Sequence, residues 1–112
     1  MDLIFVLGLA FLLTHELDAV ERGEPAFFFG WAGLSEAACR RWFIAAHVPL
    51  FVVILASLMS SGLQIGLDIF LIVHAGLHLL LRDHPLIRFN TWDSQLWIFG
   101  AALSGAAHLV MR

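Results

Sequence analysis

The sequence predicts an all-α integral membrane protein whose four helices form an antiparallel bundle. Of its 112 residues, 61% are apolar and only 13% are charged, and the mean hydropathy is +0.89. Soluble domains are about 45–50% apolar and about 25% charged, and a chain this short has too little interior to bury the excess. Because a membrane helix needs about 20 mostly apolar residues, the chain has room for four spans and for no soluble domain beside them.

The four spans are expected over residues 3–22, 42–60, 63–81 and 93–111, within a single transmembrane domain that comprises residues 1–112. No basic segment and no cleavage site accompany the first apolar run, so it is interpreted as a span and not as a signal peptide. Residues 23–41 mix proline, glycine and aromatic side chains, a composition suited to an interfacial loop in the headgroup region. A short turn makes the second and third spans a tight hairpin.

Positively charged side chains indicate the orientation. The connections that follow the first and third spans carry five of the six Arg, which are Arg22, Arg40, Arg41, Arg82 and Arg88, whereas Arg112 lies on the other side. Since positive charge is retained on the cytoplasmic side, both connections are expected in the cytoplasm and both termini on the non-cytoplasmic side of a bacterial inner membrane. The net charge of -3 does not favour nucleic acid as a partner.

Ionisable residues gather at one depth of the predicted bundle. Counted at about 1.5 Å per residue from the cytoplasmic ends of the spans, four His and two carboxylates lie roughly 6 to 12 Å into the membrane. Such groups are costly in hydrocarbon and usually face a bundle interior where they have partners. The set consists of His15, Glu16, Asp18, His47, His74 and His78.

These residue types at these spacings point to a metal site. His74 and His78 are four residues apart on one stripe of the third span, where two imidazoles can reach one ion. His15 and Asp18 are three apart on the first span, whereas Glu16 is turned about 100° away from His15. The expected ligands of Zn or Fe are His15, Asp18, His47, His74 and His78, enough for one ion with an open position or for two ions. Glu16, Glu21 and Asp93 are expected as outer partners of these ligands.

A short motif resembles a known group of proteins. The segment THELDAVERGE at residues 14–24, a His in the second span within AAHVPLF, and a third span rich in His resemble the small bacterial four-helix membrane proteins of the HXXEE type and their HELDA-containing relatives. Asp18 and Ala19 stand where the HXXEE pattern has two Glu. The resemblance implies four spans and singles out His15 and Asp18, but it implies no reaction, because these families have no established activity.

The residues leave three functions open. In the first, a Zn or Fe ion binds to the cluster, and an enzyme built on it would act on a lipid-like small molecule that enters from the bilayer. In the second, a b-type haem or related tetrapyrrole is held by two facing His, for instance His47 and His74, in an electron-transfer or accessory subunit. In the third, the polar side chains hold the helices together without a cofactor, at about 0.6–2 kcal/mol for each contact.

The opposite leaflet is expected to hold one separate pair. Asp68 and His108 lie roughly 8 and 6 Å from the outer ends of the third and fourth spans, level with each other. Desolvation penalises a lone ionised Asp at this depth, and a nearby imidazolium offsets that cost. Asp68 and His108 are therefore predicted to form a structural pair, directly or through one water.

The fourth span also carries small residues at four-residue spacing. Gly100 is spaced in this way from Ser104, and Ala101 from Gly105. Such pairs allow helices to approach closely, either inside this bundle or against another membrane protein.

Overall fold

Five α-helices and one short 3-10 helix make up the part of the chain that the structure describes. The structure is a computed structural model that describes residues 2–112. The elements are α1 (Leu3–Glu21), α2 (Pro25–Phe29), the 3-10 helix η1 (Gly30–Ala32), α3 (Glu36–Ala56), α4 (Ser61–Leu80) and α5 (Trp92–Met111), with no strand among the described residues. Four of them, α1, α3, α4 and α5, are long and apolar enough to cross a membrane. This confirms the all-helical class and the four apolar helices of spanning length.

Side-chain caps determine where three of the long helices begin. Asp2 accepts a hydrogen bond from the amide of Ile4 at 2.8 Å, and Ser60 accepts one from Leu63 at 3.4 Å. Ser35 does the same for Ala38 at 3.1 Å. Such caps satisfy amides that have no partner within the helix. Because Ser35 is a cap, α3 begins at Glu36, six residues before the span expected from residue 42.

The segment expected as an interfacial loop is also largely helical. Pro25 is the first residue of α2. At this position an amide proton would have no partner within the helix, so proline costs no hydrogen bond. The short helices α2 and η1 follow each other, and Gly33 ends η1 with a left-handed φ of 75°. The chain therefore turns back to α3 through folded structure over residues 23–35.

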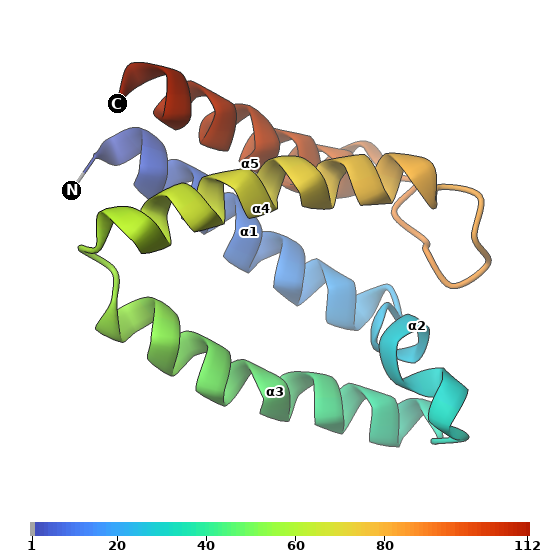
Figure 1. The fold of residues 1–112 in the computed structure, drawn as a ribbon. Coiled ribbons are helices and arrows are strands. Elements are labelled where there is room, and N and C mark those ends of the chain that lie inside the picture. Colours follow the sequence, from blue (N-terminus) through green and yellow to red (C-terminus); the bar gives the residue numbers. More distant parts are fainter. Residues whose placement is uncertain (1) are drawn as a thin grey trace.

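The long helices do not form a symmetrical bundle. α5 packs along both α1 and α4, and α1 also contacts α4, whereas α3 packs chiefly against α2. Figure 1 shows α1 and α4 running in one direction, α3 and α5 in the other, and α3 diverging from α4. The hairpin expected to be tight is therefore open beyond its turn, which corrects the sequence-based prediction.

Small residues explain why α4 and α5 approach each other closely. A Cβ atom built on Gly105 would lie only 2.9 Å from the carbonyl oxygen of Asp68. On α3, by contrast, large side chains such as Val48 and Leu55 are 66% and 69% exposed. α3 makes no extensive contact with α4, so these side chains are left to face lipid.

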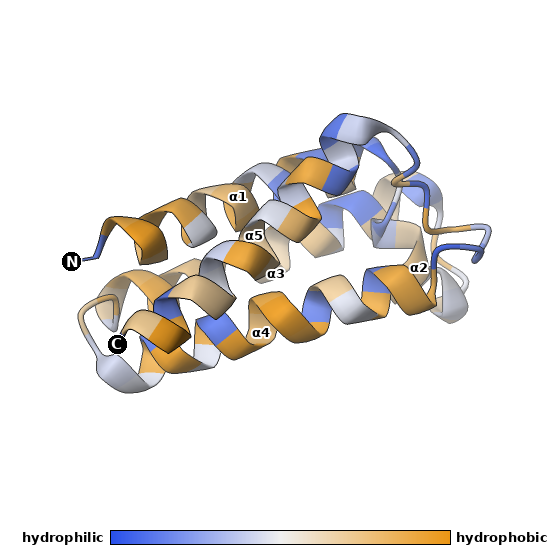
Figure 2. Cartoon of the chain, turned by 90° about the horizontal axis from the view of Figure 1, so that it is seen from above, coloured by the Kyte–Doolittle hydropathy of each residue, from blue (hydrophilic) through white to orange (hydrophobic). Residues whose placement is uncertain are grey.

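Apolar side chains cover the outside of the protein, and many of the polar ones lie inside it or at one end. Figure 2 shows hydrophobic residues along the long helices and hydrophilic residues concentrated toward the end that carries α2. The buried polar side chains are His15, Asp18, Glu24, Asp68, His78, Ser94, Ser104 and His108. This distribution suits a protein surrounded by lipid.

Candidate metal centre

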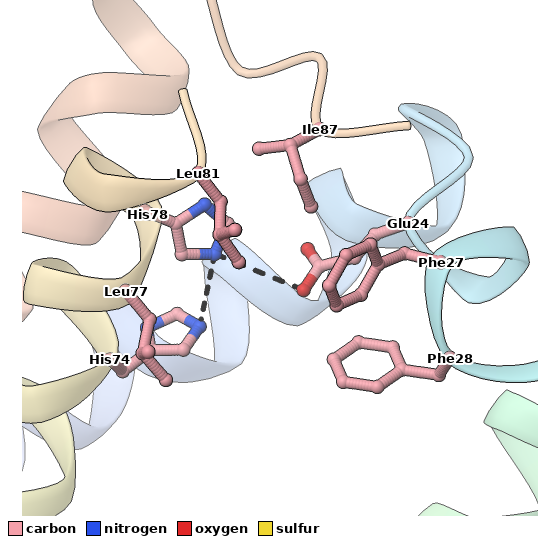
Figure 3. A pocket seen from close by; sticks show the side chains of 8 residues that line it. All are labelled: Glu24, Phe27, Phe28, His74, Leu77, His78, Leu81 and Ile87. Carbon is pink, nitrogen blue, oxygen red and sulfur yellow. Dashed lines mark hydrogen bonds and ion pairs between the residues drawn. The ribbon is translucent and has the colours of Figure 1, made fainter. Parts of the chain in front are cut away.

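Four side chains from α1, α4 and the turn after α1 converge on one point. His15, Glu24, His74 and His78 each offer one ligand atom, and these four atoms lie within 4.8 Å of one another. Nε2 of His78 is 3.2 Å from Nε2 of His74 and 3.8 Å from a carboxylate oxygen of Glu24. Nε2 of His15 is 3.7 Å from the other oxygen of Glu24. In Figure 3 the carboxylate of Glu24 faces the two imidazoles of α4.

The turn that ends α1 brings Glu24 into the cluster. The amide of Glu24 donates to the carbonyl of Ala19 at 3.0 Å, and that of Gly23 donates to Val20 at 3.4 Å. This pair of bonds is the Schellman motif, which requires a left-handed residue directly after the helix cap. Gly23 supplies it with a φ of 79°. The chain therefore reverses direction at Gly23 and places Glu24 over the last turns of α1.

Helical spacing positions the three imidazoles. His74 and His78 are one turn apart on α4, and their ring centroids lie 4.5 Å apart. The ring of His15 on α1 lies 4.6 Å from that of His74 and 5.0 Å from that of His78. Phe89, in the connection before α5, packs against both His15 and His78. The aromatic ring of Phe89 and the packing of α1 on α4 thus exclude water from one side of the cluster.

Burial leaves several polar atoms of the cluster without hydrogen bonds. His15, Glu24 and His78 are 1%, 5% and 8% exposed. Both nitrogens of His15, Nδ1 of His78 and Oε2 of Glu24 are buried and have no hydrogen-bond partner. Burial, followed by repulsion from the carboxylates of Glu16 and Asp18, raises the pKa of Glu24 from 4.5 to about 8. Unpaired buried polar atoms of this kind cost free energy, which a bound cation would recover.

The donor set fits a transition metal ion. Zinc is held by imidazole nitrogens and carboxylate oxygens at about 2.0–2.2 Å, which places tetrahedral ligands about 3.3 Å from one another. The four candidate ligand atoms lie within 4.8 Å of one another, so they must draw together by as much as about 1.5 Å to reach this geometry. Nδ1 of His15 and Nδ1 of His78 lack the acceptors that usually orient ligating His. We therefore expect weaker binding than at a zinc site with a complete second shell.

Asp18 was expected as a ligand, but the structure places it in a different network. Its Oδ1 accepts from Nε of Arg22 at 3.1 Å and its Oδ2 from the hydroxyl of Ser94 at 2.6 Å. Thr91 donates to Ser94 at 3.2 Å and accepts from Arg22 at 3.0 Å. These bonds join the end of α1 to the start of α5. Asp18 is turned to α5 because that helix packs along α1.

His47 also lies outside the cluster, which corrects a second expectation. Nε2 of His47 is 2.6 Å from Oε2 of Glu16, and Nδ1 of His47 is 2.6 Å from the carbonyl oxygen of Phe43. The physical reason is that α3 diverges from α4, so His47 reaches only the neighbouring face of α1. The structure therefore does not bring His47 and His74 together as axial ligands of a haem. The hollow beside His74 and His78 holds about 80 Å³, well below the about 300 Å³ at which ligand pockets begin.

The remaining expected residues are placed as follows. Glu21 is exposed at the end of α1. Asp93 lies 3.9 Å from a guanidinium nitrogen of Arg22, beside the Asp18 network. The structure brings Asp68 and His108 together, with Nδ1 of His108 at 2.6 Å from Oδ2 of Asp68. Neither Glu21 nor Asp93 contacts the four converging side chains.

Sequence reasoning missed Glu24, which it left in the loop. The available signal was the order Arg22, Gly23, Glu24, Pro25, because Gly is the preferred residue after a helix end and Pro commonly follows one or two residues later. That signal indicates where α1 stops. It does not indicate that the next side chain folds back over His15.

Comparisons with known proteins agree with a small protein of an uncharacterised family. No curated protein and no solved structure matches this chain. The resemblance of residues 14–24 to the HXXEE type stays a prediction. The model of a family of unknown function, DUF6713, matches residues 1–112, and this protein therefore belongs to that family.

Proposed function

We propose that this integral membrane protein binds one transition metal ion, Zn or Fe, through His15, Glu24, His74 and His78. The observation that carries the proposal is the convergence of four ligand atoms within 4.8 Å from separate parts of the chain. Three of those side chains, His15, Glu24 and His78, hold buried polar atoms that no protein group satisfies. Hydrogen bonding between helices explains paired groups, but it does not explain buried polar atoms left unpaired beside one another.

One ion accounts for the ligand set better than two. Asp18 is hydrogen-bonded to Arg22 and Ser94, and His47 is hydrogen-bonded to Glu16. Neither is therefore free to complete a second coordination sphere. Mixed nitrogen and oxygen ligands suit zinc and iron. A bound ion of either kind would supply Lewis acidity at the centre.

A substrate, if the centre is catalytic, would reach it from the bilayer. The small hollow beside the cluster is lined by Phe27, Phe28, Leu77 and other apolar side chains in addition to Glu24, His74 and His78. Phe28 and Leu77 at its edge are 46% and 48% exposed, on a surface that would face lipid. This lining favours an apolar or lipid-like molecule over a charged metabolite.

The bacterial inner membrane is the proposed location. The end of the molecule with α2 carries five of the six Arg, which supports a cytoplasmic position for that end and a non-cytoplasmic position for both termini. The metal centre then lies in the cytoplasmic half of the membrane. Proteolysis of terminal tags in oriented vesicles tests this orientation.

Metal analysis of the detergent-purified protein tests the main proposal. After incubation with Zn²⁺ or Co²⁺ and removal of the excess, we expect about one ion per chain, and for Co²⁺ the visible absorption bands of a low-symmetry site. His74→Ala should lower the content severalfold. His84→Ala is the matched control, because His84 lies outside the cluster. Substoichiometric metal in the wild type, or equal metal in both variants, would refute the proposal.

A further inference from the structure

A second polar pair lies on another face of α1. Glu16 and His47 meet at 2.6 Å and connect α1 to α3. Glu16 directly follows His15, and a helical rotation of about 100° per residue turns its side chain away from the metal centre. The side chains of Glu16 and His47 are 23% and 16% exposed, so the pair is accessible from outside the protein.

An apolar slot opens beside this pair, where α3 diverges from the other helices. It is an open groove of about 480 Å³ between α1 and α3, and all of its lining apart from Glu16 and His47 is apolar, including Leu17, Phe43 and Val48. A neighbouring hollow of about 190 Å³ shares Phe43 and His47 and continues the slot toward α2. The main volume falls within the about 300–1,000 Å³ typical of small-molecule sites.

The hydrogen bonds within the pair decide what the slot can recognise. The carbonyl of Phe43 can only accept, so Nδ1 of His47 carries a proton and donates it. Nε2 of His47 and Oε2 of Glu16 share one further proton between them. Both nitrogens of His47 are therefore engaged. The polar group that remains for a bound molecule is the second carboxyl oxygen of Glu16. This oxygen makes no hydrogen bond within residues 2–112. It can accept one whichever atom of the pair holds the shared proton.

The pair is also electrically neutral in either arrangement. A carboxylate beside an imidazolium and a carboxylic acid beside an imidazole both carry a net charge of zero. A neutral donor therefore complements the slot better than an ammonium group, whose charge would be left without a counter-ion at this depth. Ethers and esters offer no proton to the free oxygen of Glu16.

We propose that the slot between α1 and α3 binds a long-chain alcohol, whose hydroxyl donates to Glu16 and whose chain lies along Leu17, Phe43 and Val48. The slot recognises a hydroxyl-bearing lipid in the cytoplasmic half of the bilayer. This site is distinct from the metal centre and does not depend on a bound ion.

Native mass spectrometry in lipid nanodiscs tests the site with two probes of matched length, 1-hexadecanol and its methyl ether. One added hydrogen bond inside a membrane predicts about tenfold preference for the alcohol. The double variant Glu16→Leu, His47→Leu keeps the slot apolar and removes both the carboxyl acceptor and the imidazole nitrogen that the loss of Glu16 alone would free, so the two probes should then bind equally. Equal binding of both probes to the wild type, or binding of neither, would overturn the proposal.

A steric pair of variants shows where the alcohol binds. Val48→Trp fills the slot from α3 and should lower 1-hexadecanol binding at least about tenfold. The matched control is Val52→Trp, one turn further along α3, where the side chain is 60% exposed and lines neither hollow. Equal loss in both variants would contradict the assigned position. If Val48→Trp keeps its Zn²⁺ content, a failure of the alcohol-binding proposal is independent of the metal centre.

Discussion

Nδ1 of His108 lies 2.6 Å from Oδ2 of Asp68, and this pair joins α5 to α4 at the end of the bundle opposite the proposed metal centre. Both side chains are almost fully buried, with 4% and 0% of their surface exposed. Gly105 makes the contact possible, because a larger residue there would meet the backbone of Asp68. The buried apolar side chains of Leu12, Leu71 and Ala101 form a core cluster of their own, apart from this polar pair.

Removing one member of this pair should be costly. We expect Asp68→Ala and His108→Ala each to destabilise the protein by about 3 kcal/mol, since each removes one polar group and leaves its buried partner unpaired. The double variant should lose clearly less than the sum of the two, because the single variants remove the same interaction. Thermal unfolding in detergent checks this cycle, and additive effects would contradict a direct pair. Zn²⁺ content should stay unchanged in all three variants.

Metal binding should depend on pH through Glu24. Its pKa is raised to about 8, so below this pH the carboxyl group is protonated and must release a proton to ligate a cation. The Zn²⁺ affinity should therefore rise with pH up to about 8, by as much as about tenfold per unit from this group, and level off above. Calorimetric titrations at several pH values in buffers of different ionisation heat measure the released proton. Glu24→Gln should remove this contribution, and an unchanged proton release would contradict it.

The stability of the metal-free protein should change with pH in the opposite direction. The folded state holds the Glu24 proton up to about pH 8, whereas the unfolded chain releases it near the ordinary value of 4.5. Stability from this group is therefore fully present below pH 4.5 and is lost progressively as the pH rises toward 8. Unfolding temperatures measured across this range should show the decline in the wild type and a flatter curve in Glu24→Gln.

Substitutions at two glycines distinguish the effect of backbone strain from the effect of where Glu24 is placed. Gly23 and Gly33 have similar left-handed φ angles of 79° and 75°. Replacing either with Ala should cost about 1–2 kcal/mol of stability. Only Gly23→Ala should also weaken Zn²⁺ binding, because Gly23 turns Glu24 back over His15. Equal Zn²⁺ affinity in the two variants would show that the turn does not position the ligand.

A further pair of glycines tests the close contact of α4 and α5. A Cβ atom on Gly105 would meet the backbone of Asp68 at 2.9 Å, whereas one on Gly66 would meet nothing within 4 Å. Gly105→Ala should therefore destabilise the protein by about 1–3 kcal/mol. Gly66→Ala should stabilise it by up to about 1 kcal/mol through helix propensity. Chemical unfolding in mixed micelles compares the two, and stabilisation by Gly105→Ala would contradict the close contact.

Composition and residue spacing are enough to predict the helices and the polar residues that they carry. Apolar runs of about 20 residues require helices in lipid, because each backbone group must be satisfied within its own segment. Local periodicity likewise placed His74 and His78 on one stripe of α4. These features depend on neighbours along the chain, so they can be read from composition and spacing.

Which polar side chains meet depends on how the helices pack together, and residue spacing does not predict this. The depths of His15, His47 and His74 in the membrane were nearly equal, but depth does not specify the direction in which a helix faces or how far it stands from its neighbours. Because α3 packs against α2 and diverges from α4, His47 pairs with Glu16 instead of joining the cluster. Because Gly23 reverses the chain, Glu24 takes the place expected for Asp18. Helix formation is local, whereas the convergence of ligands depends on packing between segments distant in sequence.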